Sequence, residues 1–264
     1  RAVVLCGGRG SRLGALTDEL PKSLVRVHEH PLLWYVVLTL KKHGFRRLVF
    51  PLGYKGEQIR AFLESELADL DLVLECHDTG EEASIGTRLA QVTRGWASDE
   101  DFFLVNGDTF FDFDVLAMYR LHRRRNALLT LSSVEIRSQY GLIVEQQGRV
   151  VGFERDQRVS SLALDRTGTR TGHVNAGLVW LKRAALEHVD LAGSKNFEQE
   201  LYPRLIALGR VAHQRIDGHW FPVDTAKDLS IINGTASDSR IEIGDIVKTA
   251  KKDLASRYSY SVRY

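Results

Sequence analysis

The chain has 264 residues, of which 44% are apolar and 27% are charged, and its formal net charge is +2. This composition fits a globular α/β protein of one large domain or two small ones, and the near-neutral charge argues against nucleic acid as a partner. Two cysteines are too few for a disulfide framework. No apolar run approaches the roughly 20 residues that span a bilayer. We therefore expect a cytoplasmic protein with no membrane partner.

Short apolar runs alternate with amphipathic segments in the first half of the chain. The apolar runs predict strands at Ala2–Cys6, Leu48–Leu52, Leu70–Glu75 and Phe102–Val105. The amphipathic segments predict helices at Pro31–His43, Glu57–Glu66 and Asp114–Arg125. Strands that alternate with helices favour a mostly parallel sheet with helices on both faces.

The second half is richer in strands. Its pattern predicts strands at Ala127–Ile136, Leu142–Glu145, Val150–Glu154 and Val174–Leu181, and helices at Phe197–Leu208 and Ala226–Asn233. The fold class is therefore α/β, with a Rossmann-like, mixed but mostly parallel sheet. We expect one domain over residues 1–235. Residues 236–264 are either a tail with one helix and an extended end, or the start of a further domain.

A glycine cluster follows the first predicted strand. Gly7, Gly8 and Gly10 allow backbone N–H groups to approach a phosphate or a base, because no Cβ intervenes. Such a loop at the carboxyl edge of a parallel sheet lies where these folds bind ligands. Arg12 and Lys22 add positive charge suited to a polyphosphate. The alternative is a glycine-rich turn with solvated arginines.

A dinucleotide-binding loop is a second alternative, because Gly8, Gly10 and Gly14 are spaced roughly like its fingerprint. That fingerprint requires a helix directly after the glycines and an acidic residue that ends a second strand. Thr17 and Pro21 interrupt this region, and no second strand is predicted close behind it. The sequence therefore disfavours dinucleotide binding.

The segment "GGRGSRL", with Thr17 and the pair Pro21-Lys22 behind it, resembles the signature of the sugar-1-phosphate nucleotidylyltransferase family. Further motifs occur in the family's order: "GYKGEQI", "LVNGDTFFDFD", "YGLI", "GFERD", "VNAGLVWL" and "WFPVDTAKDL". The stretch "NGDTFFDFD" is most similar to heptose-1-phosphate guanylyltransferases. "GYKG" and "VDTAKDL" also resemble glucose-1-phosphate cytidylyltransferases.

The resemblance implies the nucleotide-diphospho-sugar transferase fold and a nucleotidyl transfer from an NTP to a sugar 1-phosphate. It implies Arg12, Lys22 and Asp108 as catalytic residues, and Asp108 and Asp224 as ligands of Mg²⁺. It also implies a set of nucleotide contacts and a set of sugar-phosphate contacts. The nucleotide set is Leu5, Gly7, Gly8, Gly10, Ser11, Arg12, Gly86 and Thr87, and the sugar-phosphate set is Tyr140, Gly141, Glu154, Arg155 and Asn175.

Each residue also has an ordinary structural interpretation. An aspartate after a strand is often a turn or N-cap residue, and arginine and lysine are most often solvated. Glu154 is alternatively an exposed strand residue, and Asn175 a buried, satisfied turn amide. The sequence Asp112-Phe113-Asp114 is an Asp-x-Asp of the kind that metal-dependent glycosyltransferases use. We expect Asp114 instead to cap the helix that begins at Val115.

Two departures from the family pattern bear on the substrate. Arg88 stands where relatives commonly have glycine, and Arg155 stands where they commonly have lysine. Arg88 is expected to crowd the base or to change which base or sugar fits. The departures leave open a catalytically silent regulatory homologue that binds nucleotide sugars. We favour an enzyme that uses GTP, with CTP close behind, and a homo-oligomer is possible.

Overall fold

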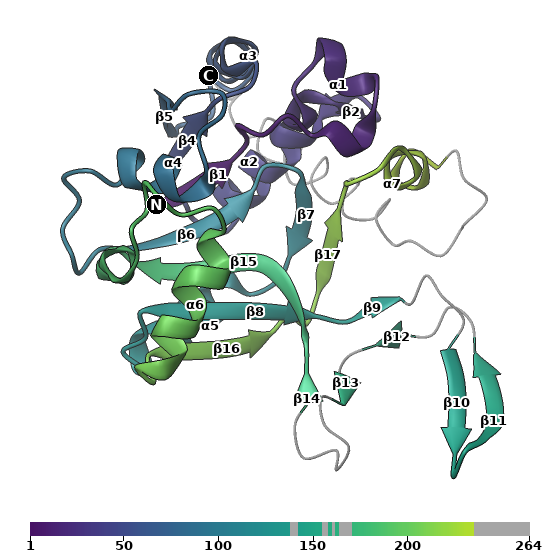
Figure 1. Ribbon diagram of the computed structural model, residues 1–264. Helices are drawn as coiled ribbons and strands as arrows, with labels where there is room; N and C mark the ends of the chain where they lie inside the picture. Colours follow the sequence, from purple (N-terminus) through teal and green to yellow (C-terminus); the bar gives the residue numbers. More distant parts are fainter. Residues whose placement is uncertain (138–141, 155–157, 160–161, 164–170, 235–264) are drawn as a thin grey trace, which may run out of the picture.

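The computed structural model describes residues 1–137, 142–154, 158–159, 162–163 and 171–234 (Figure 1). Its centre is a seven-stranded sheet with the order β16-β8-β15-β6-β1-β4-β5. The strands are β1 (Ala2–Leu5), β4 (Arg47–Leu52), β5 (Val73–Asp78), β6 (Asp101–Asn106), β8 (Leu129–Val134), β15 (Val174–Lys182) and β16 (Val211–Arg215). Strand β15 runs antiparallel to both of its neighbours, and the other adjacent pairs are parallel. The sheet is therefore mixed and mostly parallel, as the sequence predicted.

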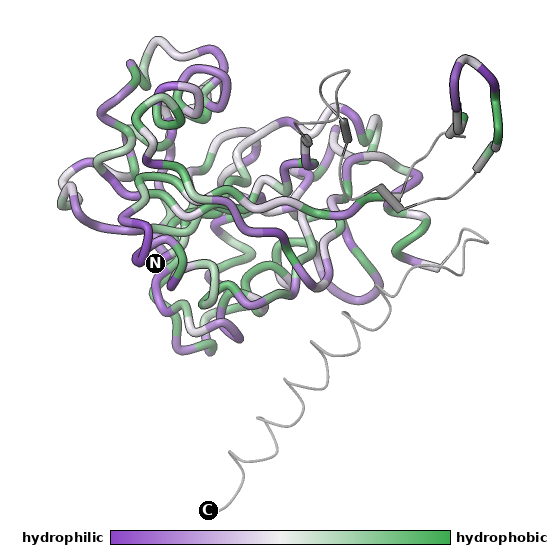
Figure 2. The backbone as a smooth tube through the Cα atoms, turned by 90° about the horizontal axis from the view of Figure 1, so that it is seen from below, coloured by the Kyte–Doolittle hydropathy of each residue, from purple (hydrophilic) through white to green (hydrophobic). Residues whose placement is uncertain are grey.

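Helices cover both faces of this sheet. Alternate strand residues point to opposite sides, so Val4 and Phe103 belong to one buried cluster while Val3 and Leu104 belong to another. On the first side lie α2 (Leu32–Lys42), α3 (Gly56–Glu66) and α5 (Val115–Arg124). On the second side lie α4 (Ile85–Val92), the 3₁₀ segment η3 (Arg183–His188) and α6 (Phe197–Ala207). In Figure 2 the central strands are mostly hydrophobic and the outer loops hydrophilic, which is the pattern of a sheet buried on both faces.

Smaller elements surround the sheet. Near the glycine cluster lie η1 (Ser11–Leu13), α1 (Leu16–Glu19), η2 (Lys22–Leu24), β2 (Arg26–Val27) and β3 (His30–Pro31). Strands β7 (Thr109–Asp112) and β17 (His219–Pro222) pair with each other, and α7 (Ala226–Ile232) follows them. Short pairs are formed by β9 (Ile136–Arg137) with β12 (Arg158–Val159), and by β13 (Leu162–Ala163) with β14 (Thr171–Gly172). The hairpin of β10 (Leu142–Gln146) and β11 (Arg149–Glu154) projects away from the main sheet in both views (Figures 1 and 2).

Most predicted elements are present, with shifted ends. Asp114 is the N-cap of α5, as expected. The helix expected to begin at Pro31 begins at Leu32, with Pro31 as its N-cap. The third strand begins at Val73 rather than Leu70, because Leu70 is buried in the turn after α3 and Val73 pairs with Arg47. The pattern did not identify α4, β7, β16 or β17. Among the described residues, no helix is long and apolar enough to cross a membrane.

A buried aspartate ties α5 to the sheet. The Asp101 side chain is only 3% exposed, and Lys182 Nζ and Arg123 Nη1 lie 2.7 and 2.9 Å from its oxygens. His122, which is fully buried, lies 3.4 Å from the same carboxylate. Burial by itself raises the pKa of Asp101, but contacts with His122, Lys182 and Arg123 outweigh burial and hold the pKa below its usual value.

We predict that Asp101→Asn lowers the free energy of unfolding by about 3 kcal/mol at pH 7, because it leaves the ammonium group of Lys182, whose side chain is only 14% exposed, without its counter-charge. Since the folded-state pKa is depressed, the carboxylate contributes its stability above the unfolded-state pKa of about 3.9. The difference between variant and parent should therefore shrink only as the pH falls below about 4. Urea unfolding at a series of pH values measures this difference in stability, and Asp99→Asn, a change at an exposed aspartate, is the control. Equal stability of parent and variant at pH 7 would contradict the prediction.

Candidate active site

Two aspartates meet at the carboxyl edge of the sheet because β7 and β17 pair. Asp108 lies between β6 and β7, and Asp224 follows β17. The antiparallel ladder places Thr109 opposite Pro222, and the N–H of Val223 donates to the carbonyl of Asp108 at 3.0 Å. Residues separated by more than a hundred positions are thus held side by side by backbone hydrogen bonds.

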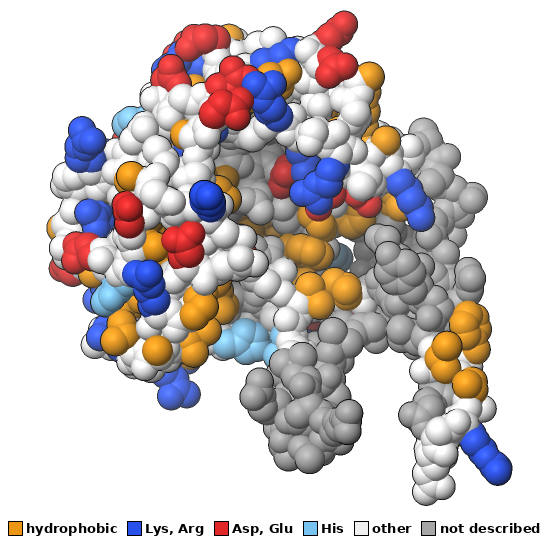
Figure 3. All heavy atoms as spheres, viewed as in Figure 1, with side chains coloured by type: hydrophobic (Ala, Val, Ile, Leu, Met, Phe, Trp, Pro, Cys, Tyr) orange, Lys and Arg blue, Asp and Glu red, His pale blue; other side chains and the backbone are white. Residues whose placement is uncertain are grey.

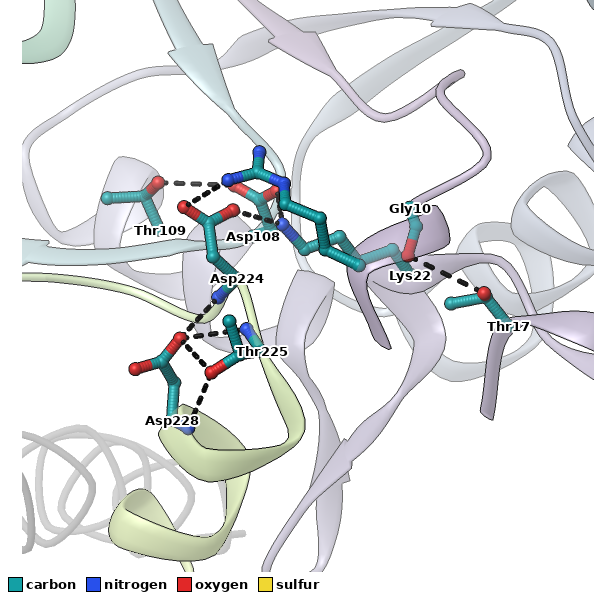
Figure 4. A network of polar contacts seen from close by, with 9 residues as sticks. Gly10, Thr17, Lys22, Asp108, Thr109, Asp224, Thr225 and Asp228 are labelled. Atoms are coloured by element: carbon teal, nitrogen blue, oxygen red, sulfur yellow. Dashed lines mark hydrogen bonds and ion pairs between the residues drawn. The ribbon is translucent and has the colours of Figure 1, made fainter. Parts of the chain in front are cut away.

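Lys22 joins the two carboxylates. Its Nζ lies 2.7 Å from Asp108 Oδ2 and 2.7 Å from Asp224 Oδ1 (Figure 4). The residue is 8% exposed, so its ammonium group has lost most of its contact with water. A buried cation is stable only with nearby counter-charges, and the two carboxylates supply them. The arrangement is therefore a compact charged centre rather than three solvated side chains.

Gly10 allows Lys22 to reach this position. A Cβ on Gly10 would lie 2.6 Å from Lys22 Cβ, and the glycine has a φ of +66°. A side chain here is therefore excluded both by space and by backbone conformation. Thr17 holds the loop from the other side, since its hydroxyl donates to the carbonyl of Gly14 at 2.9 Å and lies 3.5 Å from that of Gly10. The glycines, threonine and lysine of the motif therefore form one packed unit.

The backbone around Asp224 is fixed by the start of α7. Thr225 and Asp228 form a reciprocal capping box. The carboxylate of Asp228 also accepts the backbone N–H of Asp224 at 3.1 Å. Arg12, which is largely exposed, lies 3.1 Å from the outer oxygen of Asp224. Asp224 therefore contacts two cations, one buried and one facing solvent.

Asp108 and Asp224 fit the donor set that Mg²⁺ requires. Both present a carboxylate oxygen 2.7 Å from a single point that Lys22 Nζ occupies, so the two oxygens converge on one cation position. Mg²⁺ is usually held by one or two carboxylates, with substrate phosphates and water as its other ligands. Within the described ranges, no group of three or more His, Cys, Asp or Glu residues could hold a metal. A metal bound here therefore needs further ligands from a substrate.

The other predicted nucleotide contacts lie around the glycine loop. Leu5 ends β1 beside β6, Gly7 is buried, and Gly8 and Ser11 are exposed. The face of the molecule in Figure 3 is hollowed near its centre, and acidic and basic side chains gather above the hollow. The predicted roles of these residues as ligands remain predictions.

Gly86 and Thr87 belong to the first turn of α4, which Ser84 caps by accepting the N–H of Thr87 at 3.1 Å. A Cβ on Gly86 would lie 2.6 Å from the carbonyl oxygen of Leu191. The glycine is thus required by packing between α4 and a neighbouring loop. This packing is a reason for the glycine that the motif did not indicate.

The predicted sugar contacts are only partly described. Tyr140, Gly141 and Arg155 lie outside the described residues, and Glu154 is the last residue of β11. Asn175 is exposed on β15, and its side-chain oxygen accepts the N–H of Gly177 at 3.1 Å. The turn-amide interpretation of Asn175 is therefore correct in its hydrogen bond and wrong in its burial, and the amide is accessible.

The Asp-x-Asp sequence does not form a metal site. Asp112 pairs with Lys42 at 2.9 Å and lies 3.3 Å from His43, and these contacts lower the pKa of Asp112 to about 2 against the effect of burial. Asp114 accepts the N–H of Ala117 at 2.7 Å as an N-cap. The two carboxylates therefore serve separate structural contacts.

Two features of the site were missed by the sequence reasoning. Arg9 of the glycine cluster pairs with Glu81 and Glu82 at 2.5 and 2.8 Å and lies over the ring of Tyr54. It thereby connects the glycine loop to the loop after β5. The capping role of Asp228 was also missed, although a threonine three residues before an aspartate is its usual signal.

Comparison with known proteins gives the family. The family model described as "Nucleotidyl transferase" matches residues 1–233, so the chain belongs to the nucleotidyl transferase family. A probable glucose-1-phosphate cytidylyltransferase of Bacillus subtilis is 28% identical over 252 residues, which are 88% of this chain and 94% of that protein. A mannose-1-phosphate guanylyltransferase catalytic subunit beta of Drosophila pseudoobscura is 26% identical over 87% of this chain and 60% of its own length.

Solved structures share the fold. A putative glucose-1-phosphate thymidylyltransferase from Bacillus anthracis matches with a TM-score of 0.66 and 15% identity, covering 91% of this chain and 96% of that one. HddC from Yersinia pseudotuberculosis matches with a TM-score of 0.60 and 20% identity, covering 89% of this chain and 98% of that one. The expected nucleotidyltransferase fold is confirmed.

We predict that Lys22→Met increases the affinity for Mn²⁺ in the absence of nucleotide by roughly tenfold or more, because two neighbouring carboxylates then lack their cation. Calorimetry or the electron paramagnetic resonance signal of free Mn²⁺ measures the affinity. Lys42→Met, which removes a lysine from Asp112 instead, is the matched control. Unchanged Mn²⁺ affinity in Lys22→Met would show that the two aspartates do not act together on a cation.

We predict that Gly10→Ala destabilises the protein more than Gly209→Ala. The φ of Gly10 is +66° and that of Gly209 is +65°, and such left-handed backbone costs an alanine about 1–2 kcal/mol. Only Gly10 faces a close neighbour, whereas nothing lies within 4 Å of a Cβ on Gly209. The difference in unfolding free energy, expected to be about 1–3 kcal/mol, reports the contact with Lys22. Equal losses in the two variants would refute that contact.

Proposed function

We propose that this protein transfers a nucleotidyl group from an NTP to a sugar 1-phosphate, giving an NDP-sugar and pyrophosphate. The observation that carries the proposal is the centre formed by Lys22, Asp108 and Asp224, with Arg12 at its outer side. The family and the sugar-1-phosphate nucleotidylyltransferases among its relatives support the same reaction.

The reaction is an in-line displacement. An oxygen of the sugar phosphate attacks the α-phosphorus of the NTP, a new P–O bond forms, and the bond to the β-phosphate breaks so that pyrophosphate leaves. The attacking oxygen is already anionic, so no general base is required. The protein must instead bring two anions together and stabilise the charge that develops on the leaving group.

The residues of the centre match these tasks. Arg12 is exposed and can turn from Asp224 to the triphosphate, where it binds the departing phosphates. Lys22 is buried beside the aspartates, and its ammonium group is placed to lie between the α-phosphate and the sugar phosphate. Asp108 and Asp224 would hold Mg²⁺, which supplies Lewis-acid stabilisation of phosphate oxygens when bound. Because Lys22 and Arg12 together balance the charge of the two carboxylates, we infer that both cations move from them to the phosphates when the metal and the nucleotide bind.

GTP is the proposed nucleotide, with CTP as the second candidate. The stretch "NGDTFFDFD", which resembles heptose-1-phosphate guanylyltransferases, favours GTP. The 28% identity to a probable glucose-1-phosphate cytidylyltransferase favours CTP. A heptose, glucose or mannose 1-phosphate is the proposed acceptor. We further infer that residues 1–235 form the catalytic domain, whereas residues 235–264 lie outside the described structure.

The direct test measures pyrophosphate release with Mg²⁺ while each common NTP is combined with glucose, mannose and heptose 1-phosphates. Release that requires one NTP and one sugar phosphate supports the proposal and identifies both substrates. Nucleotide binding without release under every combination would favour the regulatory homologue. If no nucleotide binds, the proposed function fails.

We predict that Asp108→Asn lowers turnover by roughly a thousandfold while the fold is retained, because it removes a carboxylate from the proposed metal site. Asp114→Asn is the matched control, since Asp114 is an N-cap and asparagine caps helices as well as aspartate does. Steady-state kinetics with circular dichroism measures both variants. A folded Asp108→Asn protein with near-parental turnover would remove Asp108 from the mechanism.

A further inference from the structure

Arg88 is a buried cation at the carboxyl edge of the sheet, and its side chain is not directed into solvent. The residue is 5% exposed. One guanidinium nitrogen donates to the carbonyl of Leu52 at 2.8 Å and to the hydroxyl of Thr79 at 2.6 Å. The other donates to the carbonyls of Gly7 and Glu81 at 3.2 and 3.0 Å. All four acceptors are neutral, and they belong to three different strand ends.

The three strand ends are those of β1, β4 and β5. The carbonyls of Leu52 and Gly7 each accept a backbone N–H, and Arg88 adds a further donor to both. The planar guanidinium group presents several N–H groups in a fixed fork, which suits carbonyls that converge from different strands. A lysine in this place has one nitrogen and cannot repeat the geometry. Arg88 therefore acts as a cross-link between the loops that follow these strands.

Two glycines leave room for this side chain. A Cβ on Gly7 would lie 2.5 Å from Nη1 of Arg88, and a Cβ on Gly53 would lie 2.5 Å from both terminal nitrogens. Backbone oxygens are close to the same positions. A Cβ on Gly7 would lie 2.9 Å from the carbonyl oxygen of Pro51, and a Cβ on Gly53 would lie 2.6 Å from that of Gly7. The first glycine of the "GGRG" cluster is thus required by the packing beneath the loop.

The contact with Gly7 fixes a donor of the nucleotide-binding loop. The carbonyl of Gly7 accepts from Arg88 and also from the N–H of Tyr54 at 3.0 Å. A peptide group is planar and trans, so its C=O and the following N–H point in opposite directions. When the carbonyl of Gly7 is held toward the buried guanidinium, the N–H of Gly8 points away from it, on the exposed side of the loop.

We propose that Arg88 is a positioning residue for the NTP, acting through the Gly7–Gly8 peptide rather than by touching the substrate. This inference rests on the proposed function and on the expectation from the sequence that the backbone of Gly7 and Gly8 contacts the nucleotide. Arg88 preorganises the N–H of Gly8, and its buried charge adds a fixed positive field beneath the loop. Both effects favour bound nucleotide in the ground state and in the transition state alike. They therefore act on the KM for NTP rather than on kcat.

The test compares Arg88→Ala, Arg88→Lys and parent in steady-state kinetics and in calorimetric binding of the NTP. We expect Arg88→Ala to raise the KM and the Kd for NTP roughly tenfold or more, with little change in kcat or in the KM for sugar phosphate. Arg88→Lys should fall between Arg88→Ala and the parent, because it keeps the charge without the fork. Arg94→Met, which removes an exposed arginine just beyond α4, is the control and should match the parent.

Chemical rescue separates positioning from general destabilisation. Guanidinium at a non-denaturing concentration should fill the space left in Arg88→Ala and lower its KM for NTP toward the parental value. Urea, which has the same planar shape without the charge, and sodium chloride at equal ionic strength should not. Parental NTP affinity in a folded Arg88→Ala protein, equal rises in the KM for both substrates, or failure of guanidinium to rescue would each overturn the inference. If the parent itself has no turnover, the proposed function fails, and NTP binding still tests Arg88.

Discussion

The buried ammonium group of Lys22 sets the arrangement of the candidate site. It lies 2.7 Å from the carboxylates of Asp108 and Asp224, which are 116 positions apart in the sequence. Both carboxylates stabilise its buried positive charge. This contact requires three separate features of the fold. The glycine loop must leave space at Gly10, β7 must pair with β17, and α7 must hold the backbone of Asp224. A change in any of them acts on the same charged centre.

Positive charge is arranged in two layers at this edge of the sheet. Arg12 and Lys22 contact acidic side chains at the surface and just beneath it, so they can exchange those partners for phosphate. Arg88 lies beneath the glycine loop and donates only to neutral groups of the fold. Under the proposed function, Arg12 and Lys22 therefore turn to the phosphates, while Arg88 keeps its contacts with the strand ends.

Sequence reasoning identified most strands of the sheet and most helices, because hydrophobic periodicity is a local signal. The family resemblance selected Lys22, Asp108 and Asp224, which the structure brings together, and Asp114 was predicted as a cap from its place before a helix. The Lys22 ion pairs were beyond such reasoning, since they depend on the pairing of Thr109 with Pro222 across more than a hundred residues. Arg88 was expected to crowd the base or to change which base or sugar fits. Its burial among strand-end carbonyls follows from the order β1-β4-β5, which no local pattern specifies.

Four of the five proposed sugar contacts lie in one stretch of the sequence whose two flanks meet in the central sheet. Val134 ends β8 and pairs with Val174, which begins β15, so the residues on either side of this stretch are already joined by the sheet. A replacement of another length between them has little effect on the sheet, since closing the ends of a longer segment costs only slowly more. Under the proposed function, acceptor preference can therefore be changed by exchange of one contiguous segment, whereas Lys22, Asp108 and Asp224 lie outside it.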